Sequence, residues 1–424
     1  MVWWYLASQC YLLPFAMLGP NWALWPNAAD LVCGCAGLMF LLRRRSNPGP
    51  PAPVEAVRRW AWAMAVLAGA SLVFVGWALP TAFTHLGADG EALEFGCFQI
   101  YRLIQFAVIV DCASRFRWNN ERRRSLHRIT TIALVVNCAA IVATFFKVVS
   151  PAFYAPQLTA DPNVGGPWAF YHWTTDGWGV VGYSHAYTSM EVFMLTALWI
   201  ALSDQRQSEY VYLIVSASTV VILFSRSRAG LATIVLYAAF LWLQRPVVAV
   251  IVGCLLIPLM VVALPLLGSS SEELQDMLQR QSGVLDATNT ENLSGRDEIW
   301  QRWLAEIQEK PQQWLLGAGF GATSGDSAHM QPLHMLIEVG LLGVFCFAAM
   351  LYQILCSLSF REAGPKPIFW ALLAIFPSLM TQETLYPVHA LGHFCGLTLI
   401  AIVLSLHRTV APSVIPAPQP MQRR

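Results

Sequence analysis

The sequence predicts an all-α protein that crosses a membrane about twelve times, and three observations lead to that fold class. First, 56% of the 424 residues are hydrophobic and 12% are charged, whereas soluble domains carry about 25% charged residues. Second, apolar runs of about 20 residues, the length that spans a bilayer, recur along the chain. Third, lysine and arginine gather in alternate links between these runs, a pattern that orients multi-pass proteins.

The apolar runs define the candidate membrane spans, and we expect residues 1–424 to form a single transmembrane domain. The first run lacks a basic amino-terminal region and a small-residue cleavage site, which favours a membrane helix over a signal peptide. The predicted spans are residues 3–19, 24–42, 61–79, 97–114, 129–149, 185–203, 209–225, 228–244, 247–267, 333–356, 367–380 and 389–406.

The links between the spans predict the orientation. Links 43–60 and 115–128 are rich in arginine and fall on the same side when the spans are threaded in order. Because positively charged links favour the cytoplasm, we expect this side and both termini to be cytoplasmic. The Pro-rich tail, residues 410–424, is predicted to be a disordered cytoplasmic segment.

Two long segments fall on the outer side. Residues 150–184 form an outer loop rich in Trp, Pro and Gly, suited either to stacking on sugar rings or to anchoring at the membrane interface. Residues 268–332 are predicted to form a partly helical outer loop that carries site residues. Within it, Ser294 and Asp297 resemble a capping box that opens a helix over 295–310, which Pro311 ends.

Composition and missing motifs exclude several functions. The net charge of +1 argues against a nucleic-acid binder that works through bulk basicity. There is no P-loop, no His-Glu-x-x-His motif and no Asp-x-Asp motif. We therefore expect neither an ATPase nor a metal-dependent enzyme, and no cofactor.

Cations on the outer side run against the charge rule and therefore need a reason. Arg226 and Arg228 lie in Ser-Arg-Ser-Arg-Ala-Gly at the start of a span, where two guanidiniums and two hydroxyls favour a phosphate or diphosphate. The alternative is arginines that reach lipid headgroups. Arg296 opens the outer-loop helix, where a cation opposes the helix dipole, although Asp297 and Glu298 offset it.

Other side chains near the outer face are candidates with open alternatives. His329 could act as a general base or be a lone interfacial histidine. His334 shares a helix face with Glu338, so the two could form a local pair, and Glu338 is expected to fix the span to the loop. Arg102 could contact a diphosphate or pair with an acid, His185 could line the site or pack at the interface, and Glu383 could orient His329 or pair with an arginine.

These motifs resemble the O-antigen ligase and O-antigen polymerase family over about residues 215–356. The matching pieces are residues 225–230, then Ser-Gly-Arg at 294–296 with Trp300, the Gly-rich turn 316–321, and His329 followed by Glu-Val-Gly-Leu-Leu-Gly at 338–343. Ala229 replaces the first glycine of the family's pair, Met330 stands where asparagine is usual, and Pro332 interrupts the stretch before span ten.

The resemblance implies a GT-C-like architecture in the bacterial inner membrane and metal-independent, inverting glycosyl transfer on the periplasmic face. The donor would be an undecaprenyl-diphosphate-linked glycan, and the acceptor a sugar hydroxyl of lipid A–core. A polymerase would instead join lipid-linked repeat units, and a transporter of lipid-linked sugar is the alternative from another class. His329, Arg228 and Arg296 are the expected catalytic residues, and the expected substrate-binding residues are Arg226, Arg102, His185, Glu383 and His334. Membrane lipids are expected partners and nucleic acid is not.

Overall fold

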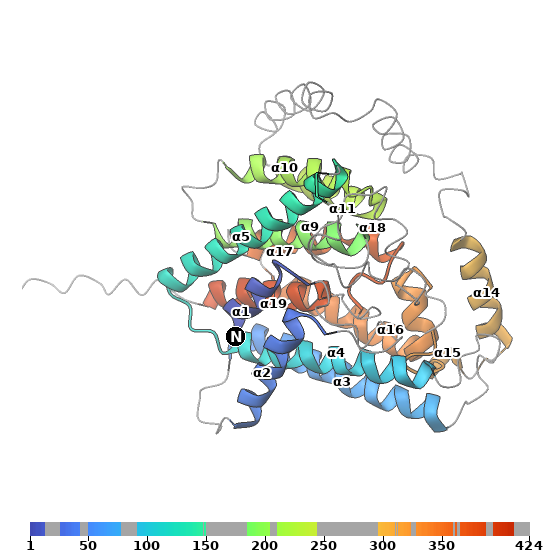
Figure 1. The fold of residues 1–424 in the computed structure, drawn as a ribbon. Helices are drawn as coiled ribbons and strands as arrows, with labels where there is room; N and C mark the ends of the chain where they lie inside the picture. Colours follow the sequence, from blue (N-terminus) through green and yellow to red (C-terminus); the bar gives the residue numbers. More distant parts are fainter. Residues whose placement is uncertain are drawn as a thin grey trace, which may run out of the picture.

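The computed structural model is a bundle of α-helices (Figure 1). It describes residues 1–12, 26–42, 50–77, 91–146, 148–149, 185–203, 210–243, 296–309, 311, 313–323, 328–358, 361–362, 365–386 and 393–410. All regular secondary structure within these ranges is helical, which confirms the all-α class. The predicted span 247–267, the aromatic loop 150–184, residues 268–295 of the second outer loop and the tail beyond Val410 lie outside the described residues.

Most of the predicted spans coincide with helices. Three segments in the described part of the chain are long and apolar enough to cross a membrane, and several shorter helices are equally apolar, as in a polytopic membrane protein. The helices that match predicted spans are α2 (Ala28–Leu42), α3 (Ala52–Trp77), α4 (Glu91–Ser114), α5 (Asn120–Phe145), α9 (His185–Leu202), α10 (Tyr210–Phe224), α11 (Arg228–Trp242), α16 (Gln331–Ser357) and α19 (Phe394–Val410).

Two predicted spans are interrupted. The expectation of an uninterrupted helix over 3–19 is wrong, because α1 (Val2–Ser8) ends where Ser8 Oγ and Gln9 Nε2 both donate to the Tyr5 carbonyl, at 2.7 and 3.0 Å. Such side-chain bonds compete with the next backbone bonds of a helix. The predicted span 367–380 is divided into α17 (Pro365–Ala374) and α18 (Phe376–Leu379), since Pro377 has no N–H to continue the helix.

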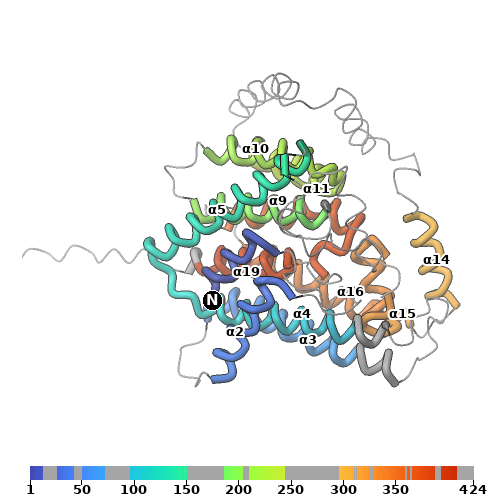
Figure 2. The backbone as a smooth tube through the Cα atoms, viewed as in Figure 1, coloured from blue at the N-terminus to red at the C-terminus, as the bar shows by residue number. Residues whose placement is uncertain are grey.

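Helix α9 lies at the centre of one half of the bundle (Figure 2). It packs against α5, α10, α11, α17 and α19, and its side chains are buried along most of its length. A helix that is apolar on all sides needs such an enclosed position. The start of α11 approaches α9 so closely that a Cβ atom on Gly230 would lie 2.2 Å from Ser189 Oγ. Glycine is therefore required where α11 begins.

The other half of the bundle contains α3 and α4, which lie side by side, with α2 and α19 against α4 and α16 against α3 (Figure 1). Helix α14 (Arg296–Glu309) confirms the predicted outer-loop helix and lies at the opposite end of the bundle from the amino terminus. Its buried residues Trp303 and Ile307 join a cluster that includes Leu333 and Ile337 of α16. Helix α14 is therefore anchored to α16.

The two arginine-rich links meet at one end of the bundle, as the threading predicts. Asp111 of α4 accepts a hydrogen bond from Arg58 of α3 at 3.1 Å and from Arg115 at 3.0 Å. Arg58 belongs to the first basic link and Arg115 to the second, so a single carboxylate joins them.

Helix α16 is kinked at Gly340, and the Gly-rich turn fits into the kink. Gly340 has φ of 65° and ψ of −172° inside the helix. The carbonyls of Ile337 and Glu338 accept hydrogen bonds from Ala318 N at 2.6 Å and Gly319 N at 3.1 Å. The turn, which follows α15 (Gln313–Leu316), therefore replaces the helical bonds that the kink removes.

Replacing Gly340 by alanine should destabilise the protein by roughly 2 kcal/mol or more, because a Cβ atom there would lie 2.4 Å from the Leu315 backbone at a positive φ. Gly69→Ala in α3 is the matched control, since a Cβ atom at Gly69 has no atom within 4 Å. Thermal unfolding of the two variants in detergent measures the difference. Equal melting temperatures would contradict the role assigned to the kink.

Candidate functional site

The turn between α10 and α11 brings Arg226 and Arg228 to the end of both helices. Ser227 caps α11 by accepting the Gly230 N–H at 3.1 Å, and Ser225 Oγ donates to the Ile222 carbonyl at 2.6 Å. The hydroxyls of Ser225 and Ser227, the two candidates for phosphate binding in this turn, therefore both form hydrogen bonds that shape it. Arg226 is buried, has a positive φ of 55° and lies over the Phe145 ring, whereas Arg228 is half-buried.

Arg228 and Arg296 come from distant parts of the chain and lie close together. Burial is the largest cause of a lowered pKa for Arg296, and the nearby charge of Arg228 lowers that pKa further. The Glu383 carboxylate acts in the opposite direction and raises it. Arginine is nevertheless charged at neutral pH. Two half-buried guanidiniums from distant parts of the chain therefore lie close together, an arrangement that a bound anion would stabilise.

His329 lies close to Arg296. Its backbone has a positive φ of 49°, an uncommon conformation for a residue other than glycine that concentrates at functional sites. Burial, followed by the charges of Arg296 and His334, lowers the pKa of His329, while Glu383 raises it. The imidazole is therefore neutral at pH 7, the form that can accept a proton.

The preceding residue fixes His329 relative to α14. Trp300 Nε1 donates a hydrogen bond of 2.7 Å to the carbonyl of the buried Ala328. Arg296 lies one helical turn before Trp300 on the same helix. A single short helix thus supplies one candidate guanidinium and positions the candidate base.

Beneath His329, His334 is enclosed by two carboxylates. Its Nε2 lies 3.4 Å from Glu338 Oε2, and its Nδ1 lies 3.3 Å from Glu383 Oε1. All three side chains are buried. The predicted pairing of His334 with Glu338 is confirmed, whereas the proximity of Glu383 to His334 was not predicted.

The Glu338 carboxylate ties α16 to the Gly-rich turn. Its Oε1 accepts the Gly321 N–H at 2.9 Å and the Thr323 hydroxyl at 3.1 Å. Thr323 Oγ1 also lies 2.9 Å from His334 Nε2. The expectation that Glu338 fixes the span to the loop is confirmed, and the glycines here form a turn between helices.

Arg102 has an acidic partner, which is one of the two outcomes expected for it. Its side chain is 1% exposed and forms an ion pair with Asp30 of α2, with His393 and Gln105 also at hydrogen-bonding distance. The guanidinium therefore has almost no free surface for a diphosphate. Its ion pair with Asp30 joins α4 to α2. His185 begins α9 as expected, and its side chain lies outside the described part of the structure.

The residues brought together can bind an anion and accept a proton. Arg228 and Arg296 supply positive charge, neutral His329 supplies a base, and Glu383 influences the pKa of both Arg296 and His329. No group of three or more His, Cys, Asp or Glu side chains within the described ranges could hold a metal ion. The chemistry that suits this arrangement is displacement of an anionic leaving group by a hydroxyl.

The fold and this site define a polytopic α-helical membrane protein with a cluster of arginines and a histidine from distant parts of its chain. Residues 211–348, which contain Arg228, Arg296 and His329, match the family model described as O-antigen ligase. This part of the chain is therefore similar to the O-antigen ligase family, and the match supports ligase- or polymerase-type glycan transfer in general. No curated protein matches the chain.

Removing the Thr323 hydroxyl should weaken the attachment of the outer loop. Thr323→Val removes one of the two hydrogen bonds that Glu338 Oε1 accepts and the hydroxyl beside His334 Nε2, and it is expected to cost about 1–3 kcal/mol of stability. Thr323→Ser retains the hydroxyl and should remain close to the wild type. Denaturation of both variants in the same detergent tests this, and equal loss in both would contradict it.

Proposed function

We propose that the protein is an O-antigen ligase-type glycosyltransferase of the bacterial inner membrane. In this proposal it moves a glycan from undecaprenyl diphosphate to a sugar hydroxyl of lipid A–core on the periplasmic face. The convergence of Arg228, Arg296 and His329 at one end of the bundle is the observation that supports it best. The match of residues 211–348 to the O-antigen ligase family supports the reaction class.

Arg228 and Arg296 are assigned to the diphosphate of the donor. A guanidinium presents a planar fork of N–H donors that fits phosphate oxygens in pairs. When the bond between the anomeric carbon and the diphosphate oxygen breaks, the bond's electron pair stays on the diphosphate. Positive charge fixed at that position stabilises the transition state more than the ground state. The arginines thereby take the charge-stabilising part without a metal ion.

His329 is assigned as the general base. The acceptor oxygen attacks the anomeric carbon while its proton passes to the neutral imidazole. A direct displacement of this kind inverts the configuration at that carbon. Glu383 is suited to stabilise the imidazolium that results, since its charge raises the pKa of His329.

The remaining candidates have supporting roles in this proposal. His334 lies between Glu338 and Glu383 and is assigned to positioning the Glu383 carboxylate. Arg226 fixes the turn that carries Arg228. His185 begins α9, whose Ser189 lies against Gly230 at the start of α11, and we assign it to a contact with the acceptor or donor.

A polymerase that joins lipid-linked repeat units would use the same donor and the same three residues. The two activities differ in the acceptor and are distinguished by analysis of surface glycan after deletion of the protein. Loss of a ligase leaves bare core while lipid-linked polymer accumulates. Loss of a polymerase leaves core capped with a single repeat unit.

Arg296→Ala should reduce glycan transfer by about 100-fold or more, the effect of removing one group that stabilises transition-state charge. Arg302→Ala removes an exposed arginine from the same helix and should have little effect. Arg228→Lys should remain poor, since a single ammonium does not reproduce the paired contacts of a guanidinium. Reconstituted protein with a lipid-linked donor provides the assay, and full activity of Arg296→Ala would remove Arg296 from the site.

The pH profile of transfer should reveal His329. Its pKa is lowered from 6.5, so activity should fall only below about pH 6.5, where the imidazole becomes protonated. Because Glu383 raises this pKa and Arg296 lowers it, Glu383→Gln should move the acidic limb to lower pH and Arg296→Gln to higher pH.

For both variants the quantity measured is the pH at which the residual activity falls to half of its maximum. The size of the residual activity itself is not compared. If the acidic limb moves in the same direction in both variants, or moves in neither of them, His329 is not the base.

A further inference from the structure

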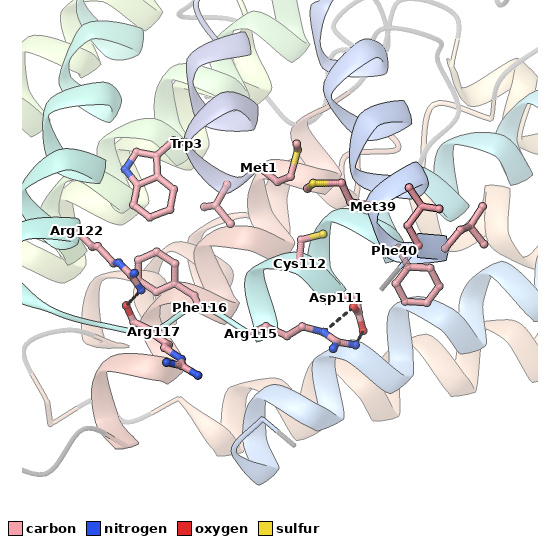
Figure 3. Close-up of a pocket in the computed structure, with 13 residues that line it drawn as sticks. Met1, Trp3, Met39, Phe40, Asp111, Cys112, Arg115, Phe116, Arg117 and Arg122 are labelled. Carbon is pink, nitrogen blue, oxygen red and sulfur yellow. Dashed lines mark hydrogen bonds and ion pairs between the residues drawn. The ribbon is translucent and has the colours of Figure 1, made fainter. Parts of the chain in front are cut away.

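A cavity of about 660 Å³ lies at the end of the bundle that carries the basic links, away from the candidate site (Figure 3). Its volume is within the range of about 300–1,000 Å³ that is usual for ligand sites. It opens between α1, α2, the end of α4 and the start of α5. Its lining residues are Met1, Val2, Trp3, Met39, Phe40, Leu41, Leu42, Asp111, Cys112, Arg115, Phe116, Arg117 and Arg122.

Three arginines make one part of the cavity wall strongly cationic. Asp111, the one carboxylate among the lining residues, is already shared by Arg58 and Arg115. Arg122 Nη1 donates a hydrogen bond of 2.8 Å to the Arg117 carbonyl, which holds these two residues together (Figure 3). Neither Arg117 nor Arg122 forms an ion pair with a carboxylate in the part of the chain that the structure describes.

The start of α5 adds to this positive potential. Asn119 caps the helix by accepting the Arg122 N–H at 2.7 Å, so Arg122 lies in the first turn. A cation in the first turn opposes the helix dipole, whereas an anion there is favoured by it. The guanidiniums and the helix terminus therefore both favour a negatively charged occupant.

The opposite wall of the cavity is apolar and continues onto the outer surface of the bundle. Met39, Leu41 and Leu42 of α2 line the cavity and are also exposed, with 45%, 79% and 74% of their surface accessible. Trp3 and Phe116 close the inner side with ring centroids 5.4 Å apart. In a membrane protein, an exposed apolar helix face of this kind contacts lipid chains.

We propose that this cavity binds the headgroup of an anionic phospholipid. The phosphate would lie among Arg115, Arg117 and Arg122, and the acyl chains would lie along α2 from Leu42 towards Leu38. A free phosphate ion would use the cationic wall and leave the apolar wall unused. Basic pockets between membrane helices on the cytoplasmic side are suited to anionic lipid headgroups.

The full-length protein, stripped of lipid in a neutral detergent, provides the test. Phosphatidylglycerol should bind saturably and raise the melting temperature, whereas phosphatidylcholine with the same chains should not. The double variant Arg117→Gln/Arg122→Gln should weaken phosphatidylglycerol binding at least tenfold. The control Arg124→Gln/Arg128→Gln removes equal charge from exposed positions of α5 outside the cavity and should bind as the wild type does.

A variant of the apolar wall gives a second measurement that leaves every charge in place. Met39→Trp should fill the cavity and weaken phosphatidylglycerol binding, while Leu31→Trp, on the exposed face of the same helix but outside the cavity, should not. If Arg117→Gln/Arg122→Gln fails to fold, the comparison of Met39→Trp with Leu31→Trp still tests whether phosphatidylglycerol binds in the cavity.

Three results would overturn the proposal. Binding of phosphatidylcholine with equal affinity would show a nonspecific apolar surface. Equal weakening by the cavity variants and their controls would show diffuse electrostatic attraction. The same stabilisation by inorganic phosphate alone, lost in Arg117→Gln/Arg122→Gln but not in Met39→Trp, would show a site for a free anion.

Discussion

The carboxylate of Glu338 is the group on which the arrangement of the candidate site depends. It is buried in the kinked helix α16 and accepts hydrogen bonds from Gly321 and Thr323 of the Gly-rich turn. A buried carboxylate without such donors costs several kcal/mol, so the turn and the helix stabilise each other. The kink at Gly340 contributes because it frees the carbonyls that the turn pairs with. The outer loop is thereby held on a membrane helix.

The environment of each arginine separates structural from functional cations. Arg102 and Arg296 both lie away from the basic links, and both are at least half-buried. Asp30 neutralises Arg102 within the bundle, whereas Arg296 faces Arg228 and shares the influence of Glu383 with His329. The first arrangement joins two helices. The second brings two arginines together close to His329, which suits binding of an anion such as a diphosphate.

Much of the fold follows from features that are local in the sequence. Apolar runs located the membrane helices, capping residues located α14, and helical spacing paired His334 with Glu338. Long-range partners were not predictable in this way: Asp30 lies 72 residues from Arg102, and no periodic pattern links Glu383 to His334. The break of the first helix at Ser8 and the kink at Gly340 depend on competing hydrogen bonds, which hydropathy does not record.

We propose that the guanidiniums at the start of α11 and of α14 bind one diphosphate together. The most direct measurement is the affinity of the purified protein for a short polyprenyl diphosphate and for the corresponding monophosphate. We expect the protein to prefer the diphosphate and to lose that preference when either Arg228 or Arg296 is replaced by glutamine, with little further loss in the double variant. Unchanged diphosphate affinity in both single variants would contradict a shared site.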